Sequence, residues 1–233
     1  MSEFVLNTPK SDDLDVPKFI ESFVAVSQQR SSLYAWLANW VAVERSKADL
    51  AHYAGPDAAV LWEVLSNCGL KEEVRRFKQA LVLLADLPYS DLELAADFAA
   101  ACLLAAAACA TPYASWYIEA DKRMYGQPAV HMQSFLSQNG LQLDSHFREP
   151  ADHLAVFLAC LSHWIEQAAD APVESIEEVA LLQADFIQTA LLSWVPLWAD
   201  RCQKLQLKTD VYPAFASLLS AFLLADTDYL SDS

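Results

Sequence analysis

The chain has 233 residues, of which 55% are hydrophobic, so it is long and apolar enough to bury a core as one large domain or two small subdomains. Its formal net charge of −16 disfavours binding to nucleic acids and to anionic membranes, because a negative field repels phosphate groups. The same field attracts a basic peptide, although the solubility of an apolar-rich protein also explains the charge.

Residue usage favours helices and a cytoplasmic location. There are only four glycines, and the abundant Ala and Leu have high helix propensity. The five cysteines form no CxxC pair, so reduced thiols within a core are expected rather than disulfides. The N-terminus lacks the features of a signal peptide, and the apolar stretch 98–110 is too short to span a membrane. We therefore expect no membrane insertion.

Helix start and stop signals are found along most of the chain. Gly69 and Gly140 follow apolar periodic segments and suit the left-handed position after a helix end. Pro196 should kink or divide a long helix. We expect helices over 16–44, 57–68, 71–86, 90–110, 128–139, 150–169, 175–205 and 210–225, a short helix or irregular segment over 113–125, a connector over 141–148, and a frayed tail from 226.

Three helix starts carry recognisable caps. Ser90 with Glu93 and Ser175 with Glu178 have the spacing of capping boxes, and Asp210 stands before the last apolar segment. The alanine-rich helix that follows Ser90 has small side chains, which let neighbouring helices approach closely. We therefore expect that helix in the middle of the bundle.

The most informative stretch is 149–153, Glu-Pro-Ala-Asp-His. Pro150 suits the first turn of a helix, with Glu149 at the cap and Asp152 in the first turn, where the helix dipole favours carboxylates. Adjacent helical residues point about 100° apart, so Asp152 and His153 would not form a catalytic dyad. They would present two polar groups to a bound segment, or Glu149 and Asp152 would simply cap the helix.

An aromatic cluster precedes this stretch. Tyr113, Trp116 and Tyr117 have the spacing i, i+3 and i+4, which places them on one face of a helix. Such a face either packs in the core or forms an aromatic platform for a peptide or ligand. Both interpretations remain open on spacing alone.

Enzymatic and metal-binding patterns are absent from the sequence. There is no GxSxG, HExxH, GxxxxGK[ST] or GxGxxG motif, so we expect no enzyme. A hydrolase that used Asp152 and His153 would need a nucleophile and an oxyanion site, and neither is recognisable. His153, Cys160 and His163 lie at i, i+7 and i+10 but would need a fourth ligand from elsewhere, so no metal site is expected.

Several of these segments together resemble the TorD family of cytoplasmic chaperones, which includes the DmsD and NarJ groups. The amino-acid sequence of the motifs is most similar to the TorD group. The resemblance is clear from 92 to 161, and elsewhere it rests on helical pattern and length. It is carried by 92–98 (LELAADF), 112–117 (PYASWY), Tyr125 with Gly126, 142–147, and 149–155 (EPADHLA).

The resemblance implies an all-α fold made of a helical bundle of two subdomains. The N-terminal subdomain would span 1–140, a hinge 141–149, and the C-terminal subdomain 150–233. Some members of the family exchange subdomains between chains, so the resemblance allows a domain-swapped homodimer.

The resemblance also implies a function in the maturation of a molybdoenzyme exported by the twin-arginine route. The partner would be the apo-enzyme and its signal peptide, held until the client receives its molybdenum cofactor. In the TorD group the client is a trimethylamine N-oxide reductase. The chaperone would hold no permanent cofactor, although weak binding of GTP is associated with the family.

By the resemblance, the surface that binds the client includes nine residues: Tyr113, Trp116, Tyr117, Tyr125, Gly126, Glu149, Pro150, Asp152 and His153. Carboxylates would bind the guanidinium groups of the peptide, and an aromatic groove would take its apolar part. We expect Asp152 and His153 near the surface, so that replacing both by alanine leaves the fold intact.

One departure from the family concerns the segment 99–102, Ala-Ala-Ala-Cys, where a glycine and bulkier apolar residues are common. It bears more on the identity of the client than on the fold. The alternatives are therefore a chaperone for another molybdoenzyme, such as a dimethyl sulfoxide reductase, and a general helical scaffold that binds peptides.

Overall fold

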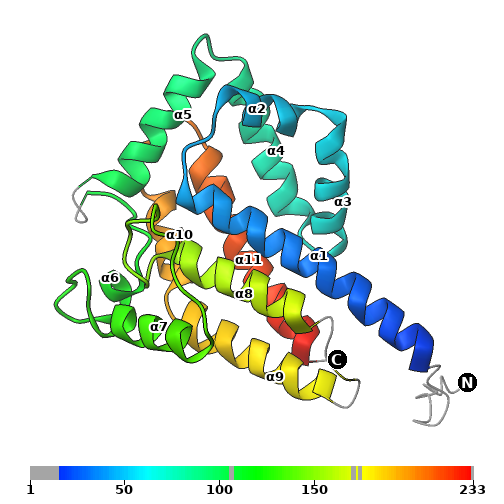
Figure 1. Ribbon diagram of the computed structural model, residues 1–233. Helices are drawn as coiled ribbons and strands as arrows, with labels where there is room; N and C mark the ends of the chain where they lie inside the picture. Colours follow the sequence, from blue (N-terminus) through cyan, green and yellow to red (C-terminus); the bar gives the residue numbers. More distant parts are fainter. Residues whose placement is uncertain (1–15, 105–107, 169–171, 173–174, 232–233) are drawn as a thin grey trace, which may run out of the picture.

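The computed structural model describes residues 16–104, 108–168, 172 and 175–231. These residues form helices, turns and one isolated bridge, which confirms the all-α fold (Figure 1). The helices are α1 (Val16–Ala42), α2 (Lys47–Ala54), α3 (Ala59–Asn67), α4 (Lys71–Ala85), α5 (Ser90–Phe98), α6 (Ala114–Ile118), α7 (Gln127–Gln138), α8 (Leu154–Ala168), α9 (Ile176–Phe186), α10 (Val195–Gln203) and α11 (Val211–Ser231), with a 3-10 turn η1 (Pro56–Ala58) and π turns η2 (Ala99–Leu103) and η4 (Ile187–Leu191).

The long helix α1 crosses the molecule and packs along α8, while α11 packs against α4, α9 and α10 (Figure 1). Trp40 of α1 is fully buried and stacks on Phe215 of α11, with ring centroids 5.4 Å apart. Its ring also contacts Phe77 of α4 at 5.2 Å, and its indole N–H donates to Tyr53 of α2. Large aromatic side chains therefore join the first and last helices into one core.

A buried ion pair holds α1, α9 and α11 together. The guanidinium of Arg30 donates to both carboxylate oxygens of Asp226, at 2.7 and 2.9 Å, and to Gln183. The hydroxyl of Tyr34 donates to the same carboxylate at 2.7 Å. The expectation of a frayed tail from 226 is wrong, because these partners compensate the burial of Asp226 and α11 continues to Ser231.

The alanine-rich segment is not the central helix that its composition indicates. It ends in the π turn η2, and both Leu103, the last residue of that turn, and Leu104 after it are exposed. Helix α5 lies at an edge of the bundle, at the upper left of Figure 1. Alanine side chains bury little apolar surface, so the bulkier faces of α1, α8 and α11 take the centre instead. Asp97 of α5 accepts hydrogen bonds from the backbone of Lys208 and Thr209 and so anchors this edge helix.

The three predicted helix caps do not form as expected. Neither Ser90 nor Ser175 makes a capping hydrogen bond to its helix. The carboxylate of Asp210 pairs with the guanidinium of Arg76 on α4, at 2.7 and 2.8 Å, rather than with its own helix. A capping box does form at Ser46 and Asp49, before α2. Long-range ion pairing competes with local capping for the same short side chains.

Other expected breaks are confirmed. Gly69 and Gly140 follow helices and have φ values of 84° and 70°. Pro196 stands in the first turn of α10, and the segment from α9 through η4 meets α10 at a bend of 48°. Among the described residues no single helix has the length and apolarity to cross a membrane, and only this bent pair meets both criteria together.

The connector over 141–148 is free of helix, as expected. Helices before it pack on helices after it, since α1 lies on α8 and α4 on α11. The division into 1–140, 141–149 and 150–233 and an exchange of subdomains between chains remain predictions.

The buried ion pair gives a first testable prediction. Replacing Arg30 by Met should lower the free energy of unfolding by about 3–5 kcal/mol, because Asp226 would be left buried without its countercharge. Urea unfolding followed by circular dichroism measures the change. The control is Arg75→Met, which removes the exposed pair with Glu72 and should cost less than about 1 kcal/mol. Equal losses in the two variants would contradict the structural role of Arg30.

Candidate functional site

The stretch 149–153 is a turn that precedes α8, not the first turn of the helix. Helix α8 begins at Leu154, and the backbone N–H of His153 donates to the carbonyl of Pro150. Pro150 and Glu149 therefore lie outside the helix, and the positions predicted for them are wrong. The side chain of His153 takes the capping role, since its Nδ1 atom accepts the backbone N–H of Ala155 at 3.2 Å.

This turn is joined to the segment that holds the aromatic cluster. Tyr113 and His153 form an isolated antiparallel bridge. The N–H of Ala114 donates to the carbonyl of Asp152, and the N–H of Leu154 donates to the carbonyl of Pro112. The two sequence motifs therefore form one structural unit, although 36 residues separate Tyr113 from Glu149.

Asp152 is the centre of this unit and is fully buried. Its Oδ2 atom accepts the backbone N–H of Ser115 at 2.9 Å and also its hydroxyl group. Ser115 lies in the first turn of α6, so the carboxylate of Asp152 caps a helix that is distant in the sequence. The hydroxyl oxygen of Ser115 in turn accepts the N–H of Gly126 at 3.1 Å. One carboxylate thus fixes α6, the loop before α7 and the turn before α8.

Gly126 is needed for close approach rather than for an unusual backbone angle. A Cβ atom at this position would overlap the carboxylate of Glu119. That carboxylate accepts the N–H of Gln127 at 2.6 Å and so caps the start of α7. Glu119 belongs to the site but is absent from the sequence prediction. Its only sequence signal is an acidic residue eight positions before a helix start.

His153 is also buried, so the expectation that Asp152 and His153 lie near the surface is wrong. Its ring lies between the rings of Tyr113 and Phe147, with centroids 5.0 and 5.4 Å away. Burial lowers the pKa of His153 from 6.5 to about 4. The imidazole is therefore neutral at pH 7. It stabilises the unit formed by the two motifs, which we call the junction, rather than binding an ion.

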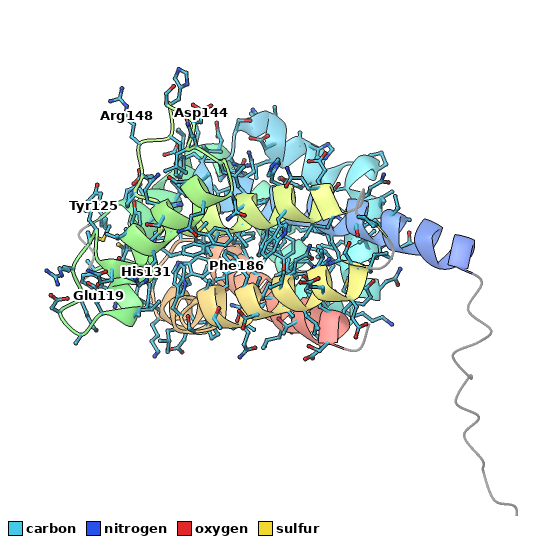
Figure 2. All side chains as sticks on the ribbon, turned by 60° about the horizontal axis from the view of Figure 1, so that its bottom comes forward. Glu119, Tyr125, His131, Asp144, Arg148 and Phe186 are labelled. Carbon is cyan, nitrogen blue, oxygen red and sulfur yellow. The ribbon has the colours of Figure 1, made fainter. Side chains whose placement is uncertain are left out.

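The outer side of the same unit carries Tyr113, Glu149 and Tyr125, which we call the outer cluster. The hydroxyl of Tyr113 donates to the carboxylate of Glu149 at 2.5 Å. Burial and then this carboxylate raise the pKa of Tyr113, and Tyr125 is close enough to contribute. Tyr125 is 69% exposed and has a φ of 60°, which is rare for a tyrosine. Figure 2 shows Tyr125 at the surface, with Asp144 and Arg148 on the neighbouring connector.

The remaining two aromatic residues face elsewhere. Tyr117 stacks on Trp194 at 5.6 Å, and the guanidinium of Arg201 lies 5.8 Å from the ring of Trp116. Tyr113 has an extended backbone and precedes α6, so helical spacing does not apply to it. The predicted single aromatic face is therefore wrong. Trp116 and Tyr117 pack toward the end and start of α10, while Tyr113 contacts the turn before α8.

The geometry does not assemble a catalytic centre from these groups. The hydroxyl of Ser115 donates to Asp152, while the Nδ1 atom of His153 is occupied by the N–H of Ala155. Serine and histidine are therefore not paired as nucleophile and base. Within the described part of the chain, no three His, Cys, Asp or Glu side chains converge as metal ligands.

Comparisons with known proteins place the chain in one family. A family model described as the nitrate reductase delta subunit matches residues 67–200. The chain is 40% identical over 218 residues to the chaperone protein TorD of Psychrobacter sp. (strain PRwf-1), covering 91% of this chain and 96% of that protein. It is 34% identical to the chaperone protein TorD of Vibrio vulnificus (strain YJ016), covering 91% and 99%, and 34% identical to that of Photobacterium profundum, covering 91% and 98%. These relatives are named as chaperones rather than as enzymes.

The buried histidine predicts a specific dependence of stability on pH. Below pH 6.5 the unfolded chain binds a proton at His153 that the folded chain does not bind until about pH 4. Stability should therefore fall between these values, by up to about 3 kcal/mol from this group. In His153→Asn, whose amide oxygen can still cap α8, this part of the loss should disappear in urea titrations at several pH values. His146→Asn, which alters an exposed histidine, should keep the wild-type profile.

A further prediction concerns Asp152. Asp152→Ala should lower the free energy of unfolding by about 2–4 kcal/mol, because the N–H and hydroxyl of Ser115 would lose their buried acceptor. The expectation that alanine at 152 and 153 leaves the fold intact is accordingly reversed. Thermal unfolding measures the change, with Asp144→Ala on the exposed connector as the control. A loss at 152 no larger than the loss at 144 would show that the junction does not depend on this carboxylate.

Proposed function

The chain belongs to the TorD family of molybdoenzyme chaperones, and we propose that it binds the twin-arginine signal peptide of its client through the outer cluster. The proposed client is a trimethylamine N-oxide reductase, held in the cytoplasm until its molybdenum cofactor is inserted. The observation that carries the proposal is the carboxylate of Glu149, which accepts the hydroxyl of Tyr113, a residue that also lies close to the exposed Tyr125.

The chemistry of the outer cluster fits a guanidinium group. Carboxylates bind arginine through charge-assisted hydrogen bonds, and aromatic rings bind it through their π faces. Glu149 is half-buried, which reduces the screening of its charge by water. The net charge of −16 adds a long-range attraction for a basic peptide.

The roles of the predicted site residues then differ. Tyr113, Tyr125 and Glu149 would touch the peptide. Asp152, His153 and Gly126 would act through the junction that positions the outer cluster, together with Pro150 in its turn. Trp116 and Tyr117 would contribute through the packing against α10. Weak binding of GTP, which the family resemblance implies, is a separate proposal that titration with the nucleotide would test.

Calorimetric titration with the leader peptide of a trimethylamine N-oxide reductase tests the function. Glu149→Gln keeps an acceptor for Tyr113 but removes the charge, so it should weaken binding by about tenfold. Tyr125→Asn tolerates the positive φ but removes the ring, and it should weaken binding by about five- to tenfold. Neither change should alter thermal unfolding. Tyr89→Asn, at another exposed tyrosine, should bind like the wild type.

The controls decide between clients. A leader with both arginines replaced by glutamine should not bind. Tighter binding of a dimethyl sulfoxide reductase leader would assign a different molybdoenzyme client. Equal binding of scrambled peptides would identify a general peptide-binding scaffold, and no binding by the folded protein would reject recognition of the signal peptide.

A further inference from the structure

A groove of about 500 Å³ lies between α1 and α8, beside the connector 141–148. We call it the α1–α8 groove. Its floor is made of small side chains of both helices, among them Ala35 and Ala38 of α1 and Ala155 and Ala159 of α8. Ala35 and Ala159 are exposed although both lie on helices of the core, so the floor is accessible from outside.

The connector forms the wall of the groove with apolar side chains. Leu141, Leu143 and Phe147 are half-buried and lean on the hydrophobic core. Phe147 also contacts the ring of His153, at 5.4 Å. The groove therefore begins at the junction that holds the outer cluster, and one extended or helical segment could contact both.

The polar rim of the groove is acidic. Asp144 on the connector and Glu166 on α8 are exposed and line the groove. None of the described residues that line it is lysine or arginine, and His163 is its only basic side chain. Such a groove suits a segment that is apolar in the middle and basic at its ends, and it disfavours an acidic segment.

Two other cavities fit such a segment less well. One of about 740 Å³, between α2, α3 and α4, is lined by Lys47 and Lys78 as well as by Glu63 and Asp86, so its lining has no excess of negative charge to attract basic residues. A cavity of about 360 Å³ between α7, α8 and α9 is apolar but smaller. It includes Phe135 and Phe186 and is not lined by any carboxylate among the described residues.

We propose that the α1–α8 groove binds the apolar segment that follows the two arginines of the client leader, while the outer cluster binds the arginines. This assignment rests on the proposed function. It explains why the connector turns its leucine and phenylalanine side chains toward the core and places Asp144 at the rim of the groove.

Filling the groove tests the proposal. Ala159→Trp places a large ring on the exposed floor, so it should weaken binding of the leader by about tenfold or more without lowering the melting temperature. Ala25→Trp, at an exposed alanine of α1 outside the groove, should bind like the wild type. Thr189→Trp fills the rim of the phenylalanine-lined cavity and should also have no effect.

A double-mutant cycle separates the two parts of the site. Replacing leucines in the apolar segment of the leader by serine should weaken binding to the wild type but not further weaken binding to Ala159→Trp. Replacing the arginines should weaken binding to both proteins. Additive losses from the serine substitutions would overturn the assignment of the groove.

The remaining outcomes are distinct. Failure of the wild-type protein to bind any leader would reject the proposed function itself. Full binding by Ala159→Trp, or loss of binding only in Thr189→Trp, would reject the groove alone. A wild-type dimer that Ala159→Trp converts to a monomer, measured by light scattering, would show that a second copy occupies the groove and would also overturn the proposal.

Discussion

The carboxylate of Asp152 is the interaction on which the candidate site depends. It is fully buried, and it accepts the N–H and the hydroxyl of Ser115, which in turn binds the N–H of Gly126. A buried carboxylate without these donors would be costly, so its presence requires α6 and the loop before α7 to stay in place. The antiparallel backbone bridge between Tyr113 and His153 fixes how the two segments of this junction are aligned.

The junction divides the most distinctive motif into two parts with different physical roles. Asp152 and His153 face inward, and the neutral ring of His153 fills the space between Tyr113 and Phe147. Glu149 stays at the surface with Tyr125. Because the inner residues are buried and hydrogen-bonded, they hold the outer side chains in position, and on the proposed function this would reduce the entropy lost when a peptide binds.

The charged residues of the protein also have different roles in the core and at the surface. The buried charges of Arg30 and Asp226 compensate each other and join α1 to α11. The buried carboxylates of Asp97 and Asp152 are instead satisfied by hydrogen-bond donors, and the outer cluster and the rim of the α1–α8 groove present further carboxylates. Packing of α1 on α8 thus creates the floor of the groove as well as the core beneath it.

Local signals in the sequence determined the all-α fold, the helix ends at Gly69 and Gly140, the break at Pro196 and the connector over 141–148. These features depend on backbone preferences within a few residues, so neighbouring residues suffice to predict them. The family resemblance also identified the residues of the motif. Only the tertiary structure decided their roles, because the partners of Asp152, Asp210 and Asp226 lie far away in the chain. A short acidic side chain caps its own helix, caps another helix or joins an ion pair according to what folding brings beside it, and no local pattern contains that information.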